Sequence, residues 1–153
     1  MAKRAIMPTL CLLAALVTMV VLRFVFPEPV LVPMPWGLIG LAPLALGIAL
    51  NLVADRAFHR AATTVKPFEV SAALITDGVF RFTRHPMYLG FVLLLVGVAL
   101  LLGAAAPWLV VVLFAALLDR AYIVAEERML AETFGPVWLD YRSRVRRWVG
   151  RRA

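Results

Sequence analysis

The sequence predicts an all-α integral membrane protein, folded as a single domain over residues 1–153 and crossing the membrane with four helices. Hydrophobic residues make up 63% of the chain and its mean hydropathy is +0.92, whereas apolar residues form about half of a typical soluble domain. Three long segments carry no charged residue: Ala5–Leu22, Pro29–Ala54 and Pro86–Leu118. Composition and pattern together predict that most of the chain lies in lipid.

These three segments give four crossings. About 20 helical residues cross the ~30 Å hydrocarbon layer, so each of the first two segments predicts one helix. The third is too long for one helix, and Gly103–Pro107 supplies a break, because glycine suits the end of a helix and proline its first turn. It therefore predicts a helical hairpin whose second arm brings Asp119 and Arg120 to the membrane interface.

The basic residues set the expected orientation. Most of them fall on one side of the four spans: Lys3 and Arg4, then Arg56, Arg60, Lys66, Arg81 and Arg84, and finally the arginines after Leu118. Cytoplasmic segments are enriched in Lys and Arg, so both termini and the central loop are predicted in the cytoplasm. Orientation and contact with anionic membrane lipids explain the net charge of +7, and no nucleic-acid partner is expected. The arginine- and alanine-rich composition suggests a bacterial inner membrane.

The polar part of the chain beyond the hairpin is predicted to hold two short pieces. Arg128–Glu132 continues the fourth helix, and Gly135-Pro136 is expected to end it. Trp138–Trp148 then predicts a C-terminal amphipathic helix in the membrane interface, with its aromatic residues at headgroup depth and its arginines on the polar side. The chain has one cysteine and two histidines, so no metal site is expected.

Two polar groups of residues flank the hairpin. Arg84 and His85 precede Pro86, which suits the first turn of a helix, and the free N–H groups of that turn favour an anion. Glu126 and Glu127 follow the second arm, so the hairpin returns both groups to the same membrane face. Adjacent helical residues point about 100° apart, and the two glutamates are therefore expected not to face one partner. One is expected to bind a ligand and the other to pair with an arginine.

A purely structural interpretation of the same residues stays open on physical grounds. Arg84 also suits a membrane anchor whose charge reaches the interface, and the glutamate pair also suits a solvated helix exit. Two glycine pairs lie seven residues apart and are predicted to mark close helix packing rather than ligand contacts: Gly40 with Gly47, and Gly90 with Gly97.

The motifs carry a family resemblance. The segment from Leu74 to Gly90, which reads LITDGVFRFTRHPMYLG, is followed by the EERML segment that begins at Glu126, then by Phe134-Gly135 and Tyr141. In this order the chain resembles the isoprenylcysteine carboxyl methyltransferase family and its bacterial and phospholipid methyltransferase-like relatives. The resemblance covers about residues 63–148.

The resemblance implies an integral membrane enzyme that uses S-adenosylmethionine in a cytoplasm-facing pocket. It implies a lipophilic or lipidated acceptor, methylated on a carboxylate, thiol or amine. By motif, the cofactor would contact Leu74, Ile75, Phe80, His85, Pro86, Met87, Tyr88, Glu126 and Glu127. Relatives often carry an acceptor-binding arginine four residues before the glutamate pair. Tyr122 stands at that position here, which leaves Arg120 as the nearest arginine.

Two other functions stay open from the sequence. A membrane reductase of the steroid-reductase type shares a similar Arg-His-Pro region and binds NADPH, although it is expected to carry an acidic residue where this chain has Phe91. A non-catalytic membrane subunit is the second alternative. No catalytic base is assigned, and the acceptor and the oligomeric state are left open.

Overall fold

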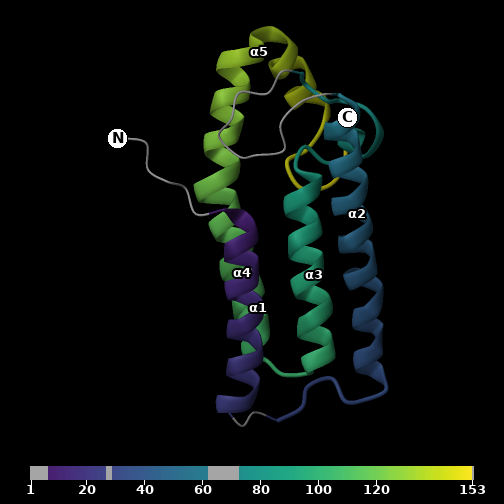
Figure 1. Ribbon diagram of the computed structural model, residues 1–153, viewed down its shortest axis with the longest axis vertical. Helices are drawn as coiled ribbons and strands as arrows, with labels where there is room; N and C mark the ends of the chain where they lie inside the picture. The colour runs from purple at the N-terminus through teal and green to yellow at the C-terminus, as the bar shows by residue number, and fades with distance from the viewer. Residues whose placement is uncertain (1–6, 27–28, 62–72, 153) are drawn as a thin grey trace.

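The computed structural model describes residues 7–26, 29–61 and 73–152, and these form helices and connecting turns. Figure 1 shows the helices side by side, with α1 next to α4, α3 in the middle and α2 at the other edge. In chain order the elements are α1 Pro8–Val25, η1 Trp36–Gly40, α2 Leu41–Arg60, η2 Gly78–Arg81, α3 Pro86–Leu102, α4 Ala106–Leu117, the π-helix η3 Leu118–Ile123, and α5 Val124–Arg144.

The helices have the length and composition that a membrane requires. Three of them are long and apolar enough to cross it: Pro8–Val25, Trp36–Arg60 and Ala106–Arg144. The last runs over 39 residues with a kink at Gly135, and its part before the kink, residues 106–134, measures about 43 Å at 1.5 Å per residue. It therefore exceeds the ~30 Å hydrocarbon layer, and its α5 part rises beyond the other helices (Figure 1). Helix α3 is a shorter apolar helix over Pro86–Leu102.

The predicted hairpin is confirmed. Helix α3 ends at Leu102, and Gly103 caps it with φ of 66°, a left-handed conformation that only glycine adopts readily. Helix α4 begins at Ala106 with Pro107 in its first turn. The carbonyl of Gly103 accepts hydrogen bonds from the backbone N–H groups of Leu31 and Val32, at 2.7 and 3.2 Å, which ties the α1–α2 connection to the same end of the bundle.

Glycines allow α2 and α3 to pack with their backbones in close contact, as predicted. A Cβ placed on Gly47 would lie 2.6 Å from the carbonyl oxygen of Gly90, and one on Gly97 would lie 2.6 Å from that of Gly40. Real Cβ atoms do not approach backbone so closely. Small residues let membrane helices gain packing contacts where lipid offers no hydrophobic driving force, so these glycines fix the α2–α3 interface.

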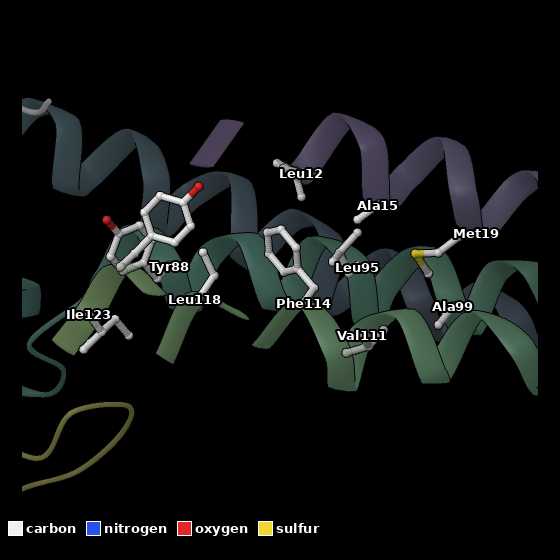
Figure 2. Packing of buried hydrophobic residues seen from close by; sticks show 11 residues of the cluster. Leu12, Ala15, Met19, Tyr88, Leu95, Ala99, Val111, Phe114, Leu118 and Ile123 are labelled. Atoms are coloured by element: carbon white, nitrogen blue, oxygen red, sulfur yellow. The ribbon is translucent and has the colours of Figure 1, made fainter. Parts of the chain in front are cut away.

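A second interface joins α1, α3 and α4. Figure 2 shows Met19 of α1 above Ala99 of α3, and Leu95 of α3 beside Phe114 of α4. Met19, Leu95 and Ala99 have no exposed surface. Toward the polar end of the bundle the same cluster ends at aromatic residues, which include Tyr88 and Tyr122.

Helix α2 differs from its predicted bounds. Residues Pro29–Pro35 lie outside the helices, because prolines at 29, 33 and 35 interrupt regular hydrogen bonding. At its other end α2 continues past the uncharged segment to Arg60. The helical span that can cross a membrane is therefore Trp36–Arg60.

The expected placement of the C-terminal aromatic residues is wrong. Gly135, with φ of 50° and ψ of −123°, introduces a kink, but the helix resumes and runs to Arg144. Trp138 and Tyr141 are only 1% and 3% exposed. They pack with Phe80, whose carbonyl accepts a 2.7 Å hydrogen bond from the Tyr141 hydroxyl. The kink turns these aromatic rings onto the protein's own central loop, so they do not face lipid headgroups.

Candidate functional site

A cavity of about 220 Å³ lies where α1 and α3 begin and α2 ends. Its walls are largely aromatic and apolar, with one arginine, one histidine and one glutamate among them. Its lining consists of Met7, Pro8, Thr9, Phe58, Phe80, Arg84, His85, Pro86, Met87, Tyr88, Phe91 and Glu126. An apolar cavity with a few converging polar groups is the usual form of a small-molecule site.

The start of α3 places the basic side chains at this cavity. Pro86 occupies the first turn, as predicted, where its missing N–H costs no hydrogen bond. The backbone N–H of His85 donates to Thr83 Oγ1 at 3.2 Å, and Thr83 Oγ1 donates to the carbonyl of Arg147 at 3.3 Å. These contacts anchor the segment before α3 to the C-terminal part of the chain.

Arg84 is buried with part of its hydrogen-bonding capacity unused. Its side chain is 3% exposed, and its Nη2 lies 3.1 Å from Glu127 Oε1. Its guanidinium also lies 5.6 Å from the centre of the Trp138 ring, a cation–π contact. Nε and Nη1 have no hydrogen-bond partner among the described residues. Burial lowers the pKa of Arg84, whereas the Glu127 charge opposes that shift, and a guanidinium stays protonated. Two buried N–H donor groups of a cation are therefore available.

Glu127 is the centre of an ionic cluster. Its Oε1 accepts from Arg147 Nε at 3.2 Å, and its Oε2 accepts from Arg147 Nη2 at 2.7 Å. Arg147 Nη1 donates to both carboxylate oxygens of Asp119, at 3.1 and 3.2 Å. The hydrogen bond to Glu127 is the largest cause of the raised pKa of Arg147. The prediction that one glutamate pairs with an arginine is confirmed.

The expectation that the two glutamates cannot face one partner is wrong. His85 lies between them: its Nε2 is 3.4 Å from Glu127 Oε1 and its Nδ1 is 3.8 Å from Glu126 Oε2. The imidazole has nitrogens on two sides, so it can meet two carboxylates that point in different directions. Its ring also stacks on Tyr88, with centroids 5.8 Å apart. Glu126 Oε2 is buried and has no hydrogen-bond partner among the described residues.

Comparisons with known proteins decide the family. The family model for phospholipid methyltransferase matches residues 36–137. The chain belongs to the phospholipid methyltransferase family. Over 75 residues it is 36% identical to the protein-S-isoprenylcysteine O-methyltransferase of Schizosaccharomyces pombe, which covers 47% of this chain and 30% of that protein. It is also 36% identical over 63 residues to an uncharacterised protein of Haemophilus influenzae, covering 41% of this chain and all of that protein. No solved structure matches.

Family membership and the apolar helices together make the chain an integral membrane protein. The region matched by the phospholipid methyltransferase model runs from η1 into α5 and contains most of the cavity lining. Met7, Pro8 and Thr9 of the lining precede that region, and Arg147 of the ionic cluster follows it.

The predicted site residues divide between two cavities and the protein surface. Phe80, His85, Pro86, Met87, Tyr88 and Glu126 line the first cavity. Leu74 and Ile75 line a second cavity of about 680 Å³, on the side of η2 and the charged end of α2. Neighbours along the chain line different cavities, Val79 the second and Phe80 the first, so η2 borders both cavities. Glu127 lies behind His85, outside the lining of both cavities. The Arg120 side chain is 87% exposed.

Sequence reasoning missed several residues at the site. Phe58 and Phe91 line the cavity, but in an apolar sequence their rings look like ordinary membrane-facing residues. Arg147 is one of six arginines between positions 142 and 152, and nothing in the local sequence distinguishes it from its neighbours. Only the folding of the chain end onto α5 shows which arginine reaches Glu127.

Proposed function

We propose that this protein is an S-adenosylmethionine-dependent membrane methyltransferase that methylates a lipophilic or amphipathic acceptor. The observation that carries the proposal is the pairing of unsatisfied atoms in the first cavity. Within the part of the chain that the structure describes, Arg84 Nε and Nη1 are buried donors without hydrogen-bond partners, and Glu126 Oε2 is a buried acceptor without one. A free amino-acid group, with its carboxylate and its ammonium, complements both. S-adenosylmethionine carries such a group.

The aromatic lining of the cavity suits the positive charge of the cofactor's sulfonium group. The rings of Phe58, Phe80, Tyr88 and Phe91 border the cavity, and aromatic faces attract cations. When bound, S-adenosylmethionine supplies an electrophilic methyl group on a sulfonium. At about 220 Å³ the first cavity is smaller than the ~300–1,000 Å³ of most ligand pockets. We place the methionine end there and the nucleoside end toward Leu74 and Ile75 in the second cavity.

The residues favour a reaction that depends on positioning. Methyl transfer from a sulfonium is an in-line displacement, so alignment and exclusion of water supply much of the rate. The cavity walls can exclude water, and the Glu127 cluster can hold His85 in place. A carboxylate or thiolate acceptor needs no strong base, and no catalytic base is assigned for an amine.

The acceptor is proposed to be amphipathic, with its apolar tail among the helices and its nucleophile on the side of Arg120. Because Arg120 is exposed and lines neither cavity, Arg120→Ala should raise the acceptor concentration for half-maximal turnover and leave cofactor affinity within about twofold. Radiolabelled methyl transfer to detergent-solubilised membrane lipids measures the acceptor dependence. Equilibrium binding measures the cofactor affinity. If Arg120→Ala lowers cofactor affinity and leaves the acceptor dependence unchanged, Arg120 does not lie at the acceptor's nucleophile.

The proposed orientation puts the site in the cytoplasm of a bacterium, with both termini on that side. The α1–α2 connection and the α3–α4 turn lie together at one end of the bundle, opposite the cavity (Figure 1). In a Cys11→Ser background, cysteines at Val30 and Ala105, both exposed, should react with a membrane-impermeant thiol reagent added to intact cells. A cysteine at Asp77 should react only after lysis. The reverse pattern would invert the orientation.

Binding of S-adenosylmethionine and of NADPH to the detergent-purified protein tests the proposed function. The comparisons give no support to the reductase alternative or to a non-catalytic subunit. Saturable binding of S-adenosylmethionine without binding of NADPH is the expected result. Binding of NADPH alone would favour the reductase, and binding of neither would favour a non-catalytic role.

A further inference from the structure

Arg147 uses its whole guanidinium within the ionic cluster. Nε and Nη2 approach the two oxygens of Glu127, at 3.2 and 2.7 Å, and Nη1 approaches those of Asp119, at 3.1 and 3.2 Å. A planar fork that donates to two carboxylates fixes their orientation, which a single ammonium cannot do. Arg147 therefore joins the π-helix η3, which holds Asp119, to the first turn of α5, which holds Glu127.

The chain end is folded so that Arg147 reaches this position. After α5 the backbone reverses, with an antiparallel bridge between Val145 and Arg151 and a 2.8 Å hydrogen bond from the N–H of Arg146 to the carbonyl of Gly150. The N–H of Gly150 donates to the carbonyl of Phe82 at 2.7 Å. Residues 145–152, which we term the C-terminal turn, are thus tied to the segment that carries Arg84 and His85.

The carboxylate that Arg147 holds is the one that faces His85. An ionised carboxylate only accepts hydrogen bonds, so the 3.4 Å contact of Glu127 Oε1 with His85 Nε2 requires the proton on Nε2. The other nitrogen, Nδ1, lies 3.8 Å from Glu126 Oε2. Both of these side chains line the cavity. Glu127 thereby fixes the orientation of the His85 ring in the cavity wall.

We propose that Arg147 is a positioning residue for the cofactor site, acting through Glu127 on His85, and that the C-terminal turn is a working part of the site. This inference rests on the proposed function. Arg147 lies outside the region matched by the family model, so the matched region alone lacks the arginine that binds both oxygens of Glu127. Arg84 also contacts Glu127, but through one nitrogen, so it cannot replace the fork.

The test uses full-length protein purified in detergent, with binding of S-adenosylmethionine measured by calorimetry and folding by thermal melting. Arg147→Gln should weaken binding by about tenfold, the size of a lost charged hydrogen bond. Arg147→Lys keeps the charge but not the fork, and it should not restore affinity. Arg146→Gln removes the same charge from the neighbouring, exposed position and should bind within twofold of the unaltered protein.

A double-mutant cycle separates positioning from general stabilisation. In a Glu127→Gln background, Arg147→Gln should have little further effect on binding, because the contact through which it acts is already lost. Three results would each overturn the inference. The first is unchanged affinity in Arg147→Gln, and the second is full affinity in Arg147→Lys. The third is that Arg147→Gln and Glu127→Gln have independent effects. If Arg147→Gln does not fold, the Arg147→Lys variant carries the same test. If the unaltered protein binds no S-adenosylmethionine, the proposed function fails first, and this inference fails with it.

Discussion

Replacement of Glu126 by glutamine is expected to weaken S-adenosylmethionine binding by about ten- to a hundredfold, with the fold retained. Glu126 Oε2 is buried without a hydrogen-bond partner among the described residues, and a bond between an ammonium and a carboxylate is worth roughly 1.5–3 kcal/mol. Glutamine keeps the shape of the side chain but removes its charge. His85→Ala should give a loss of similar size, because it removes the ring that stands between Glu126 and Glu127.

Matched controls exist for both substitutions. Glu132 lies on the same helix as Glu126 but is exposed, and the His59 side chain is 73% exposed at the end of α2. Glu132→Gln and His59→Ala should leave affinity within about twofold, as measured by calorimetry on detergent-purified protein. Equal losses in the controls and the site variants would show a general effect of charge or folding and would remove Glu126 and His85 from the site.

The largest effect on stability is expected at the interface of α2 and α3. In Gly47→Val the new Cβ would lie 2.6 Å from the carbonyl oxygen of Gly90 and 3.0 Å from the backbone nitrogen of Leu94. Backbone cannot move aside as a side chain can, so the helices must separate. A cost of about 3 kcal/mol, the upper end for overpacking, corresponds to a fall in melting temperature of about 10 °C for a chain of this size.

The control for this substitution lies on the same helix. Ala45 is exposed on α2, so Ala45→Val places the same valine side chain on the lipid-facing side, and it should change the melting temperature in detergent by less than about 2 °C. If the Gly47→Val protein has the same melting temperature as the unaltered protein, α2 and α3 do not pack through their glycines.

Much of the helical architecture follows from the sequence because lipid imposes strict requirements. A spanning segment must be apolar and must satisfy its backbone hydrogen bonds internally, so uncharged segments predict helices directly. Gly103 and Pro107 bring the only break in the third segment, and the hairpin forms there. The glycine pairs predict close packing for a similar reason, because nothing else allows two backbones to approach so closely.

The chain end could not be predicted in the same way. An arginine- and tryptophan-rich segment after a proline has the composition of an interfacial helix, and composition does not show which face packs on protein. Gly135 decides it, because the kink with φ of 50° directs Trp138 and Tyr141 onto Phe80. That contact depends on the geometry of one residue and on a partner far away in the sequence.

The site likewise has some residues that the sequence predicts and others that only the fold identifies. His85, Tyr88 and Glu126 were predicted because they lie at the two ends of a hairpin, and the cavity brings all three together. The ionic partners of Glu127 were predicted only as a class. The sequence indicates an arginine, whereas the fold selects Arg84 and Arg147 from fourteen candidates of the same type.

The central claim is that the cavity holds the amino-acid end of S-adenosylmethionine through Arg84 and Glu126. The most direct measurement compares the affinity of the purified protein for S-adenosylhomocysteine and for 5′-methylthioadenosine, which keeps the nucleoside and lacks the amino-acid group. The structure predicts that 5′-methylthioadenosine binds at least about tenfold more weakly, since it leaves Nε and Nη1 of Arg84 and Oε2 of Glu126 without hydrogen-bond partners among the described residues. Equal affinity for the two compounds would contradict this placement.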